Sequence, residues 1–462
     1  MKKMKCLLAI SACAVLAFPV AACTPPVNEN EYVEGKYNIT VACQAEEGEE
    51  AVMEKLASAY EAKNPDVNII VKNFGSSDLD GYMQNYAWSE DKLANIVWVP
   101  DDKFAPWAAK GHFVDLRPMY EASAETSYDL YYESMLHAAS YTGEYKPYSE
   151  DKSAKHALYY APRDYNKIGI CYNTELFENF GLYDLLPEDF SHENWNMETF
   201  ITFLQGVSAK IKAAGAAYSA SYDAIHLFLQ WEPVYTSVFK EMGSSGILDA
   251  NYDLNLKSDE NRKILSKLYD ELFSDKTMLG TEDGFKQGYT TMTVCVRPTA
   301  YTFYSVMKGK VDFLPFPTEA VGAGCSGYAI TTKTASQTQE ANGVEKTNKE
   351  LCWDFIKYII SEEGQEVAGE FGTSVPILKS LKESGSWTKA MNTDLNHSAW
   401  LAGEELRLTT YNVFQPDARP NLRSCVDAIM NKQQSVDEGT YAKMTGWLDT
   451  YTTNFNRVND LL

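Results

Sequence analysis

One stretch carries the clearest structural pattern in the chain: Ile96-Val97-Trp98-Val99-Pro100-Asp101-Asp102-Lys103-Phe104-Ala105-Pro106-Trp107-Ala108-Ala109-Lys110-Gly111. Its first four residues are apolar and predict a buried strand, since a short apolar run bounded by turn residues is typical of one. The segment from Asp101 to Lys110 predicts a helix that Gly111 ends. A strand, an acidic loop and a helix in succession form one unit of an α/β fold.

The preceding residues repeat this order of strand, loop and helix. Alternating apolar residues predict strands over 37–41 and 67–71. A helix is expected from Glu49 until Asn64-Pro65 stops it, and another over 79–86. Such alternation predicts a largely parallel sheet with helices on both faces. Because ligands bind beyond the carboxyl ends of strands in such sheets, the loops at 44–47, 74–77 and 100–103 are expected to outline a cleft.

A second α/β set follows in the middle of the chain. Its expected strands cover 168–173, 292–296 and 311–314, and its expected helices lie near 196–213 and 234–241. The glycine-rich segment 322–330 is expected to be a crossing between the two sets. A helix carrying Leu351 and Ile359 comes next, and residues 398–462 are expected to be mostly helical.

The N-terminus has the features of an export signal. Three lysines precede an apolar run, and Val20-Ala21-Ala22-Cys23 follows it. This pattern is typical of a secretory signal rather than a membrane span, which needs about 20 apolar residues. The four residues resemble a bacterial lipobox, which implies cleavage before Cys23, a diacylglycerol on its sulfur and a tether over 23–36. The alternative is an ordinary signal peptide with a chance cysteine.

The composition excludes several classes of partner. The 462 residues carry a formal charge of −23, and loss of residues 1–22 would remove three lysines and no acidic residue. An acidic balance of this size argues against nucleic acid or an anionic lipid surface as a partner. About 440 mature residues exceed what one core usually serves, so two domains are expected.

The sequence lacks the motifs of common enzyme classes. Its six histidines show no HExxH or HxH spacing, and no GxSxG, P-loop or GxGxxG motif is present. No catalytic residue, metal or cofactor is therefore expected. A glycosidase carboxylate pair stays open, because distance rather than sequence defines it. Six cysteines remain beyond the signal and the anchor, without a CxxC pair, and mostly free, buried thiols are expected.

Several segments together resemble the family 1 extracellular solute-binding proteins, the maltose-binding-protein-like sugar receptors of ABC importers. They are the N-terminal strand, acidic loop and helix ending at residue 65, the stretch 96–111, the segment Gly169-Ile170-Cys171-Tyr172-Asn173 with Phe177 and Asn179, and Leu314-Pro315-Phe316-Pro317 before the glycine-rich crossing. The resemblance covers nearly all of residues 37–460.

The resemblance implies a two-lobed α/β, periplasmic-binding-protein-like (type II) fold with the ligand cleft between the lobes. Lobe 1 would comprise 37–162 plus 329–395, and lobe 2 would comprise 168–325 plus 398–462. The implied function is a monomeric receptor, lipid-anchored on the extracytoplasmic face of the cell membrane. It would capture a carbohydrate and deliver it to the ABC permease subunits. The alternatives are a receptor for a non-sugar polar solute and a surface-anchored glycoside hydrolase.

Aromatic and acidic side chains are the expected contacts of a sugar, because ring faces stack on pyranoses and carboxylates accept from hydroxyls. Trp231 and Tyr235 stand where family members place aromatic contacts, although two residues four apart also pack one helix face. By matching to the family, Asp102 is a hydroxyl acceptor, whereas Asp101 is either an acceptor or a helix cap. Gln44 is expected in the site with Glu46 and Glu47 as weaker candidates; a solvated loop is the alternative.

Two arginines complete the expected site. Arg297 and Arg419 are candidates to clamp the ligand in two-pronged fashion, and surface ion pairs are the alternative. Family members often carry Gly-Arg-Trp where this chain has Val296-Arg297-Pro298, so Tyr301 or Tyr304 is expected to replace the tryptophan platform. Arg163-Asp164 near a crossing is interpreted as a hinge ion pair or as a ligand contact.

Overall fold

The computed structural model describes residues 32–44, 48–75, 77–140, 145–229, 231–246 and 258–406. Cys23, Glu46, Glu47, Arg419 and most of the predicted C-terminal helical region lie outside these ranges. Residues 32–406 belong to a single compact unit by their contacts.

The first sheet is built around three parallel strands, as the alternation of strand and helix predicts. Within the described residues it runs in the order β12-β9-β3-β1-β2, and β4 also pairs with β9. Its strands are β1 (Tyr37–Cys43), β2 (Val67–Asn73), β3 (Ile96–Pro100), β4 (Ala161–Lys167), β9 (Ala320–Ile330) and β12 (Glu404–Leu406). The β1 strand is parallel to β2 and β3, whereas β9 runs antiparallel to β3 and β4.

The second sheet has the order β6-β7-β5-β8. It is formed by β5 (Gly169–Asn173), β6 (Asp223–His226), β7 (Thr290–Cys295) and β8 (Val311–Pro315), and β10 (Thr338–Ala341) forms a separate hairpin with β11 (Val344–Thr347). Both neighbours of β5 run antiparallel to it, and only β6 and β7 are parallel. The parallel arrangement predicted for the first strands holds for β1 to β3, whereas this second sheet is mostly antiparallel.

Helices connect and cover the strands. They are α1 (Glu49–Lys63), α2 (Leu79–Tyr86), α3 (Ala105–Ala109), α4 (Arg117–Glu121), α5 (Glu133–Ala138), α6 (Thr174–Phe180), α7 (Met197–Ala213), α8 (Ala216–Ser219), α9 (Glu232–Glu241), α10 (Asp259–Leu268), α11 (Glu282–Lys286), α12 (Arg297–Val306), α13 (Thr332–Ala335), α14 (Asn348–Ile359), α15 (Glu362–Gly369) and α16 (Lys379–Ser384). The α3 helix starts four residues later than the sequence predicts, because residues 101–103 form a turn.

Three apolar clusters form the interior. The first surrounds β1, β2 and β3 with α1 and α14, and the second contains the apolar faces of α7 and α9 with β5, β6 and β7. The third joins α12 and β8 to residues 375–400 through Trp387, Met391 and Trp400. Trp387 and Met391 thus pack beside second-sheet residues, although the predicted boundary gives them to the first lobe. That boundary stays a prediction.

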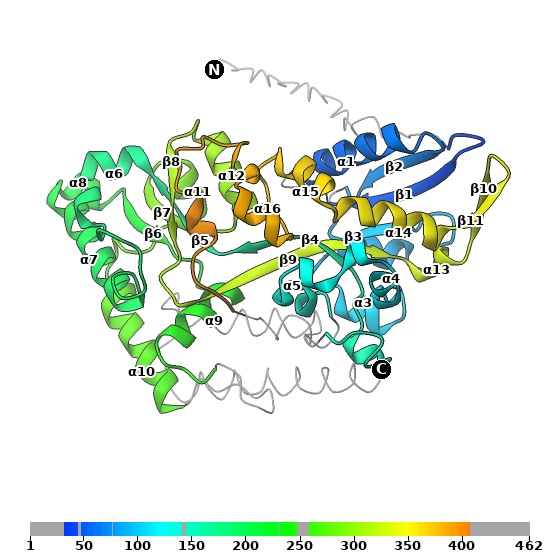
Figure 1. The fold of residues 1–462 in the computed structure, drawn as a ribbon. Coiled ribbons are helices and arrows are strands. Elements are labelled where there is room, and N and C mark those ends of the chain that lie inside the picture. The colour runs from blue at the N-terminus through cyan, green and yellow to red at the C-terminus, as the bar shows by residue number, and fades with distance from the viewer. Residues whose placement is uncertain are drawn as a thin grey trace, which may run out of the picture. The chain divides into compact units, whose positions relative to one another are not determined.

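The crossing strands β4 and β9 lie side by side (Figure 1) and connect the two sheets through the chain. Close approach is possible at Gly327, where a Cβ atom would lie 2.0 Å from the Ala161 carbonyl oxygen. Lys167 at the end of β4 is 4 % exposed, and its ammonium group donates to the carbonyl oxygens of Leu401, Ala402 and Gly403. This lysine fastens the 401–403 turn to β4, just before β12 pairs with β9.

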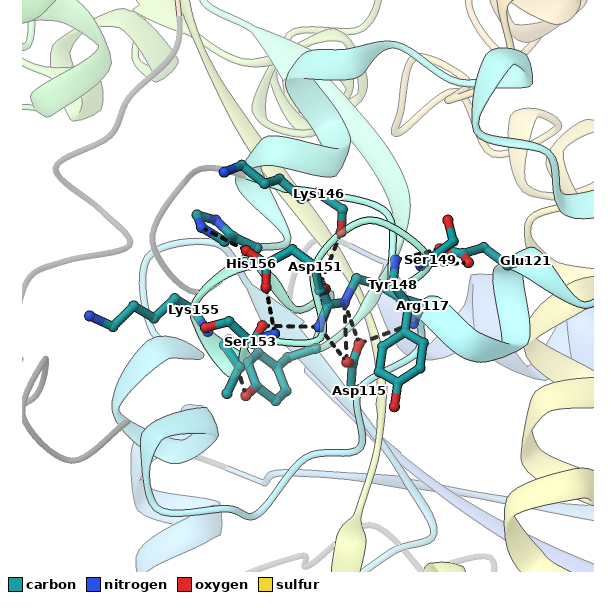
Figure 2. A network of polar contacts seen from close by, with 12 residues as sticks. Asp115, Arg117, Glu121, Lys146, Tyr148, Ser149, Asp151, Ser153, Lys155 and His156 are labelled. Atoms are coloured by element: carbon teal, nitrogen blue, oxygen red, sulfur yellow. Dashed lines mark hydrogen bonds and ion pairs between the residues drawn. The ribbon is translucent and has the colours of Figure 1, made fainter.

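A fully buried arginine holds the loop over residues 145–156 (Figure 2). Nε of Arg117 donates to both carboxylate oxygens of Asp115 at 3.1 Å, and Nη2 donates to Oδ2 at 2.8 Å. It also donates to the carbonyl oxygens of Lys146, Asp151 and Ser153, at 3.0, 2.6 and 3.0 Å. The charge of Arg117 is compensated by one carboxylate, and the remaining donors are used on backbone of the loop.

All five cysteines within the described ranges are free and buried: Cys43, Cys171, Cys295, Cys325 and Cys352. The prediction of free, buried thiols is confirmed for these five, and Cys425 lies outside the described residues. No helix among the described residues is long and apolar enough to cross a membrane.

Candidate ligand-binding site

A cavity of about 230 Å³ lies beyond the carboxyl ends of β1 and β3 and along the crossing strands β4 and β9. It is lined by Gln44, Glu49, Trp98, Pro100, Asp101, Asp102, Arg163, Asp164, Asn166, Trp231, Val296, Pro298, Gly324, Cys325, Ser326 and Thr373. The lining combines two indole rings with carboxylate, amide and hydroxyl groups. This mixture suits a polar ligand that also has an apolar face.

The wall near β3 is fixed by hydrogen bonds to β9. Asp101 accepts from the Cys325 backbone N–H at 3.0 Å, while its own N–H donates to the Cys325 carbonyl oxygen at 2.8 Å. The Trp98 indole N–H donates to Ser326 Oγ at 3.2 Å. Ser326 in turn donates to Asp164 through both its N–H and its hydroxyl group, at 2.9 Å each. The Trp98 ring and the Asp101 carboxylate are therefore held in position before any ligand arrives.

The opposite part of the lining comes from the starts of α9 and α12. Trp231 is the N-cap residue of α9, and its half-buried ring stacks on Phe228 with centroids 5.5 Å apart. Phe228 has a positive φ of 53°, a backbone conformation that non-glycine residues rarely adopt and that often occurs at functional sites. Val296 and Pro298 flank the first residue of α12.

A buried ion network forms the floor of the cavity. Arg163 is 3 % exposed and its Nη2 donates to Glu49 at 2.5 Å and to Asp164 at 2.6 Å. The Tyr328 hydroxyl group donates to the other oxygen of Glu49. Burial raises the pKa of Glu49, while the guanidinium group and the tyrosine hydroxyl oppose that rise. The lining holds four carboxylates and one guanidinium group, so the cavity has an excess of negative charge.

Residues 55–393 match the sequence model of the family described as bacterial extracellular solute-binding protein. The match covers more than half of the chain. The chain belongs to this family. Its members are binding proteins rather than enzymes, and their extracellular description places this solute-binding protein outside the cytoplasm. Comparison with curated protein sequences finds no significant match.

Solved structures of binding proteins share the same two-lobed α/β fold. An ABC substrate-binding protein from Listeria monocytogenes in complex with cycloalternan is similar with a TM-score of 0.64 and 15% identity, over 92% of this chain and 99% of that one. The sugar-binding protein MalE from Xanthomonas citri has a TM-score of 0.65 at 14% identity, over 91% and 98%. Maltose-bound MalE3 of T. maritima gives 0.63 at 14% identity, over 90% and 99%.

Four of the predicted site residues meet at the cavity of this solute-binding protein: Gln44, Asp101, Asp102 and Trp231. The first three come from loops that follow strands β1 and β3, as the strand-end argument predicts. Trp231 comes from the start of α9. Their roles as ligand contacts stay predictions.

The structure places three other predicted residues away from the cavity lining. Tyr235 is 3 % exposed and packs in the second apolar cluster, which matches the alternative of helix packing. Tyr301 is half-buried and packs against the third cluster, as does Tyr304. Arg297 is fully buried, with its guanidinium carbon 4.3 Å from the centroid of the Trp387 ring. Arg419 lies outside the described residues.

Arg297 makes its contacts inside the protein rather than in the cavity lining. Its Nη1 is 3.1 Å from His397 Nδ1, and its Nη2 donates to the Trp387 carbonyl oxygen at 3.1 Å. No carboxylate in the described part of the chain pairs with it, and burial lowers its pKa to about 9. The neighbouring Pro298 does line the cavity.

Several lining residues were not predicted as contacts. Trp98 lies within strand β3. The only sequence feature that could have indicated its place in the lining is an amphipathic ring in an otherwise aliphatic run. Asn166, Ser326 and Thr373 carry no local signal, because they reach the cavity only through the pairing of β4 with β9 and the turn after α15. No group of His, Cys, Asp and Glu within the described ranges is arranged to hold a metal ion.

Proposed function

We propose that this solute-binding protein captures a carbohydrate and delivers it to the membrane permease of an ABC importer. The observation that carries the proposal is the cavity lining, in which Trp98 and Trp231 accompany Asp101, Asp102 and Gln44. Indole faces stack on the apolar faces of pyranose rings, and carboxylate and amide groups bind hydroxyl groups. The Listeria and T. maritima proteins of similar fold are bound to cycloalternan and maltose, which supports a sugar as the ligand class.

The ligand would bind between two lobes, with 37–162 plus 329–395 as the first and 168–325 plus 398–462 as the second. Both contribute to the cavity lining, the first through Asp101 and the second through Trp231. Binding to groups from both lobes favours a closed form, so the ligand shifts the population toward it. The closed form would then dock on the permease subunits as a monomer.

The receptor would be exported and held at the membrane by a lipid on Cys23. The support is the sequence Val20-Ala21-Ala22-Cys23 after a basic and apolar leader. A tether over residues 23–36 raises the effective concentration of the receptor beside its permease.

Isothermal titration calorimetry of a protein that starts after Cys23 tests this proposal against a panel of glycans and other polar solutes. The expected result is binding of one glycan per chain without its consumption. Binding of an amino acid or peptide with no response to any glycan would replace the sugar by a non-sugar solute. Turnover of the glycan at catalytic rates would reject the receptor function.

A further inference from the structure

A second cavity, of about 400 Å³, lies beside the first sheet and shares no lining residue with the ligand cavity. Its volume is within the range of about 300–1,000 Å³ that is usual for small-molecule sites. It is bounded by the 90–95 loop, which leads into β3, and by the segment that runs from α13 to the first residue of α14. Its lining consists mainly of polar residues: Tyr32, Thr40, Lys72, Glu90, Asp91, Lys92, Leu93, Ala94, Asn95, Thr334, Gln337, Thr338, Gln339 and Asn348.

Asn95 presents a free donor to this second cavity. Its Oδ1 accepts from the backbone N–H and from the hydroxyl group of Thr40, at 2.9 Å each. Because a backbone N–H can only donate, the amide atom that faces Thr40 is the oxygen, and the NH2 group lies on the other side. Asn95 Nδ2 makes no hydrogen bond within the described part of the chain, although the residue is only 6 % exposed. This nitrogen is not one of the fully enclosed polar atoms that lack a partner, so a ligand in the cavity can reach it.

A chain of side-chain amides ends in a second free donor. Gln339 Oε1 accepts from the Asn38 N–H at 2.7 Å, which fixes the direction of this amide. Gln339 Nε2 then donates to Asn348 Oδ1 at 2.7 Å, and Asn348 Nδ2 donates to Gln337 Oε1 at 3.3 Å. Gln337 Nε2 is left without a partner among the described residues. The second cavity therefore offers N–H donors from two amides, whereas each amide oxygen of its lining already accepts a hydrogen bond.

Two lysines add positive charge to the lining. Lys72 and Lys92 are exposed, and neither forms an ion pair within the described ranges. Two carboxylates also line the second cavity, but Glu90 is paired with Lys333 at 3.6 Å. Asp91 is the one carboxylate of this lining that has no ion pair in the described part of the chain. Two ammonium groups and two amide donors suit a ligand that accepts hydrogen bonds and carries negative charge.

We propose that the second cavity binds a small oxyanion, which is a carboxylate or a phosphate group. The oxygens of the ligand accept from Asn95 Nδ2 and Gln337 Nε2, while Lys72 and Lys92 supply the opposite charge. This site goes beyond the proposed carbohydrate function and does not depend on it.

Calorimetry at constant ionic strength, in a buffer free of phosphate and carboxylates, tests this site. The probes are inorganic phosphate, succinate and succinamide, which is the neutral counterpart of succinate. We expect saturable binding of one phosphate or succinate per chain, and much weaker binding of succinamide. In isotope-labelled protein, the NMR signal of the Asn95 side-chain amide should shift over the same range of oxyanion concentration, which locates the binding.

Three substitutions should change the oxyanion affinity in different directions. Lys92→Gln should weaken binding by about 3- to 10-fold, because one partly exposed charge-assisted hydrogen bond is lost. Asn95→Asp keeps an oxygen for Thr40 but replaces the donor by a second oxygen, so the affinity should fall by about 10-fold or more. Asp91→Asn should tighten binding by about 2- to 5-fold, because a like charge is removed from the lining.

Lys55→Gln is the matched control. Lys55 is exposed on α1, forms no ion pair among the described residues and is absent from the lining of the second cavity. The control removes the same charge from the protein and should keep the oxyanion affinity within about 2-fold, because salt screens distant exposed charges.

Absence of saturable oxyanion binding by the wild-type protein would overturn the site. Unchanged affinity in both Lys92→Gln and Asp91→Asn would do the same, and these exposed positions carry the test even if Asn95→Asp does not fold. Equal losses in Lys92→Gln and Lys55→Gln would reduce the binding to general charge attraction. Succinamide binding as tight as that of succinate would reject the selection of an anion. Glycan binding is measured separately, so a failure of the carbohydrate function leaves this result unaffected.

Discussion

Among single residues, Trp231 depends most on its neighbours for its position. It precedes α9 as the N-cap residue, so its ring is positioned by Phe228 as well as by the helix. Phe228 stacks on one face of the indole at an interplanar angle of 28°. With one face supported in this way, the rest of the ring is available to the cavity that it lines. The aromatic stack thus presents a preformed surface to a sugar.

Trp231→Ala should weaken sugar binding by about 1–3 kcal/mol, because the aromatic surface that the ligand buries is lost. Calorimetry against the tightest glycan of the panel measures the change. Trp88→Ala is the matched control, since Trp88 is 71 % exposed and is absent from the cavity lining. Equal affinities of wild type and Trp231→Ala would remove this ring from the site.

His397 is the residue most sensitive to pH in the Arg297 environment. Burial lowers its pKa, and the positive charge of Arg297 adds to that shift, while Asp312 and the bond to the Asn392 carbonyl oxygen oppose it. Nε2 of His397 lies 2.9 Å from that carbonyl, so it carries the hydrogen and Nδ1 accepts from Arg297. A protonated ring would place a second donor against the guanidinium group.

The lowered pKa makes the folded protein bind fewer protons than the unfolded chain near the usual histidine pKa of about 6.5. The free energy of unfolding should therefore be highest above pH 6.5 and fall as the pH decreases below it. Each pKa unit of difference contributes about 1.4 kcal/mol. Urea unfolding at pH 7.5 and 5.5 measures the fall, which His397→Asn should reduce because its amide oxygen can accept from Arg297. An identical fall in the variant would assign the effect to other groups.

Among the elements, β9 has the tightest constraints on its sequence. It pairs with β3, β4 and β12, and its register with β4 shifts between Pro162 and Asp164. Gly327 faces this irregularity, where the chain of β4 approaches closely. By contrast, a Cβ atom at Gly324 in the same strand meets nothing within 4 Å.

Gly327→Ala should destabilise the protein by about 1–3 kcal/mol or more, since the added methyl group meets backbone that can move only by separating the strands. Gly324→Ala is the control and should change the free energy of unfolding by less than about 0.5 kcal/mol. Chemical denaturation measures both variants. A stability loss in Gly324→Ala as large as that in Gly327→Ala would contradict the geometry described for β9.

Local sequence patterns predict the elements of this fold better than their pairing. The alternation in Tyr37–Val41 and the apolar run Ile96–Val99 are properties of neighbouring residues, and strands β1 and β3 form there. Antiparallel pairing of β5 with β7 joins residues 120 or more positions apart, so no local pattern reports it. A glycine at position 327 indicates that another part of the backbone approaches closely there. Only the three-dimensional structure identifies that part as Ala161.

The same division applies to the candidate site. Asp101 and Asp102 were predictable because the end of a parallel strand locates a cleft. Arg297 was a candidate because a guanidinium group can clamp a ligand in two-pronged fashion, yet its side chain packs on Trp387, which is 90 residues later in the chain. Thr373 could not be predicted, because it reaches the cavity lining through a turn in which Gly372 has a φ of 66°.

For the whole molecule, the proposed anchor joins a strongly acidic receptor to the membrane. The formal charge of −23 offers no attraction to anionic lipids, so the covalent lipid would be the main membrane contact. On this proposal, a single attachment residue would decide whether the receptor stays at the cell surface.

Cys23→Ser should move the protein from the membrane fraction to the soluble extracytoplasmic fraction, because the thiol that would carry the lipid is removed. Fractionation and immunoblotting of cells that express either form measure the distribution. Sugar affinity should be unchanged in the variant, since residue 23 precedes the first strand of the fold. Retention of Cys23→Ser in the membrane fraction would contradict a lipid on this residue.

The hydrogen bonds from Arg117 to the loop over residues 145–156 affect which mutations this loop can accept. Arg117 donates to the backbone carbonyl oxygens of Lys146, Asp151 and Ser153. Every amino acid has such a carbonyl oxygen. Mutations at these three positions keep the hydrogen bonds as long as the backbone follows the same path. Asp115 and Arg117 must be kept together, because the carboxylate compensates the charge of the buried guanidinium group. Substitutions at Lys146, Asp151 and Ser153 therefore leave the hydrogen bonds from Arg117 intact, because these bonds use backbone oxygens alone.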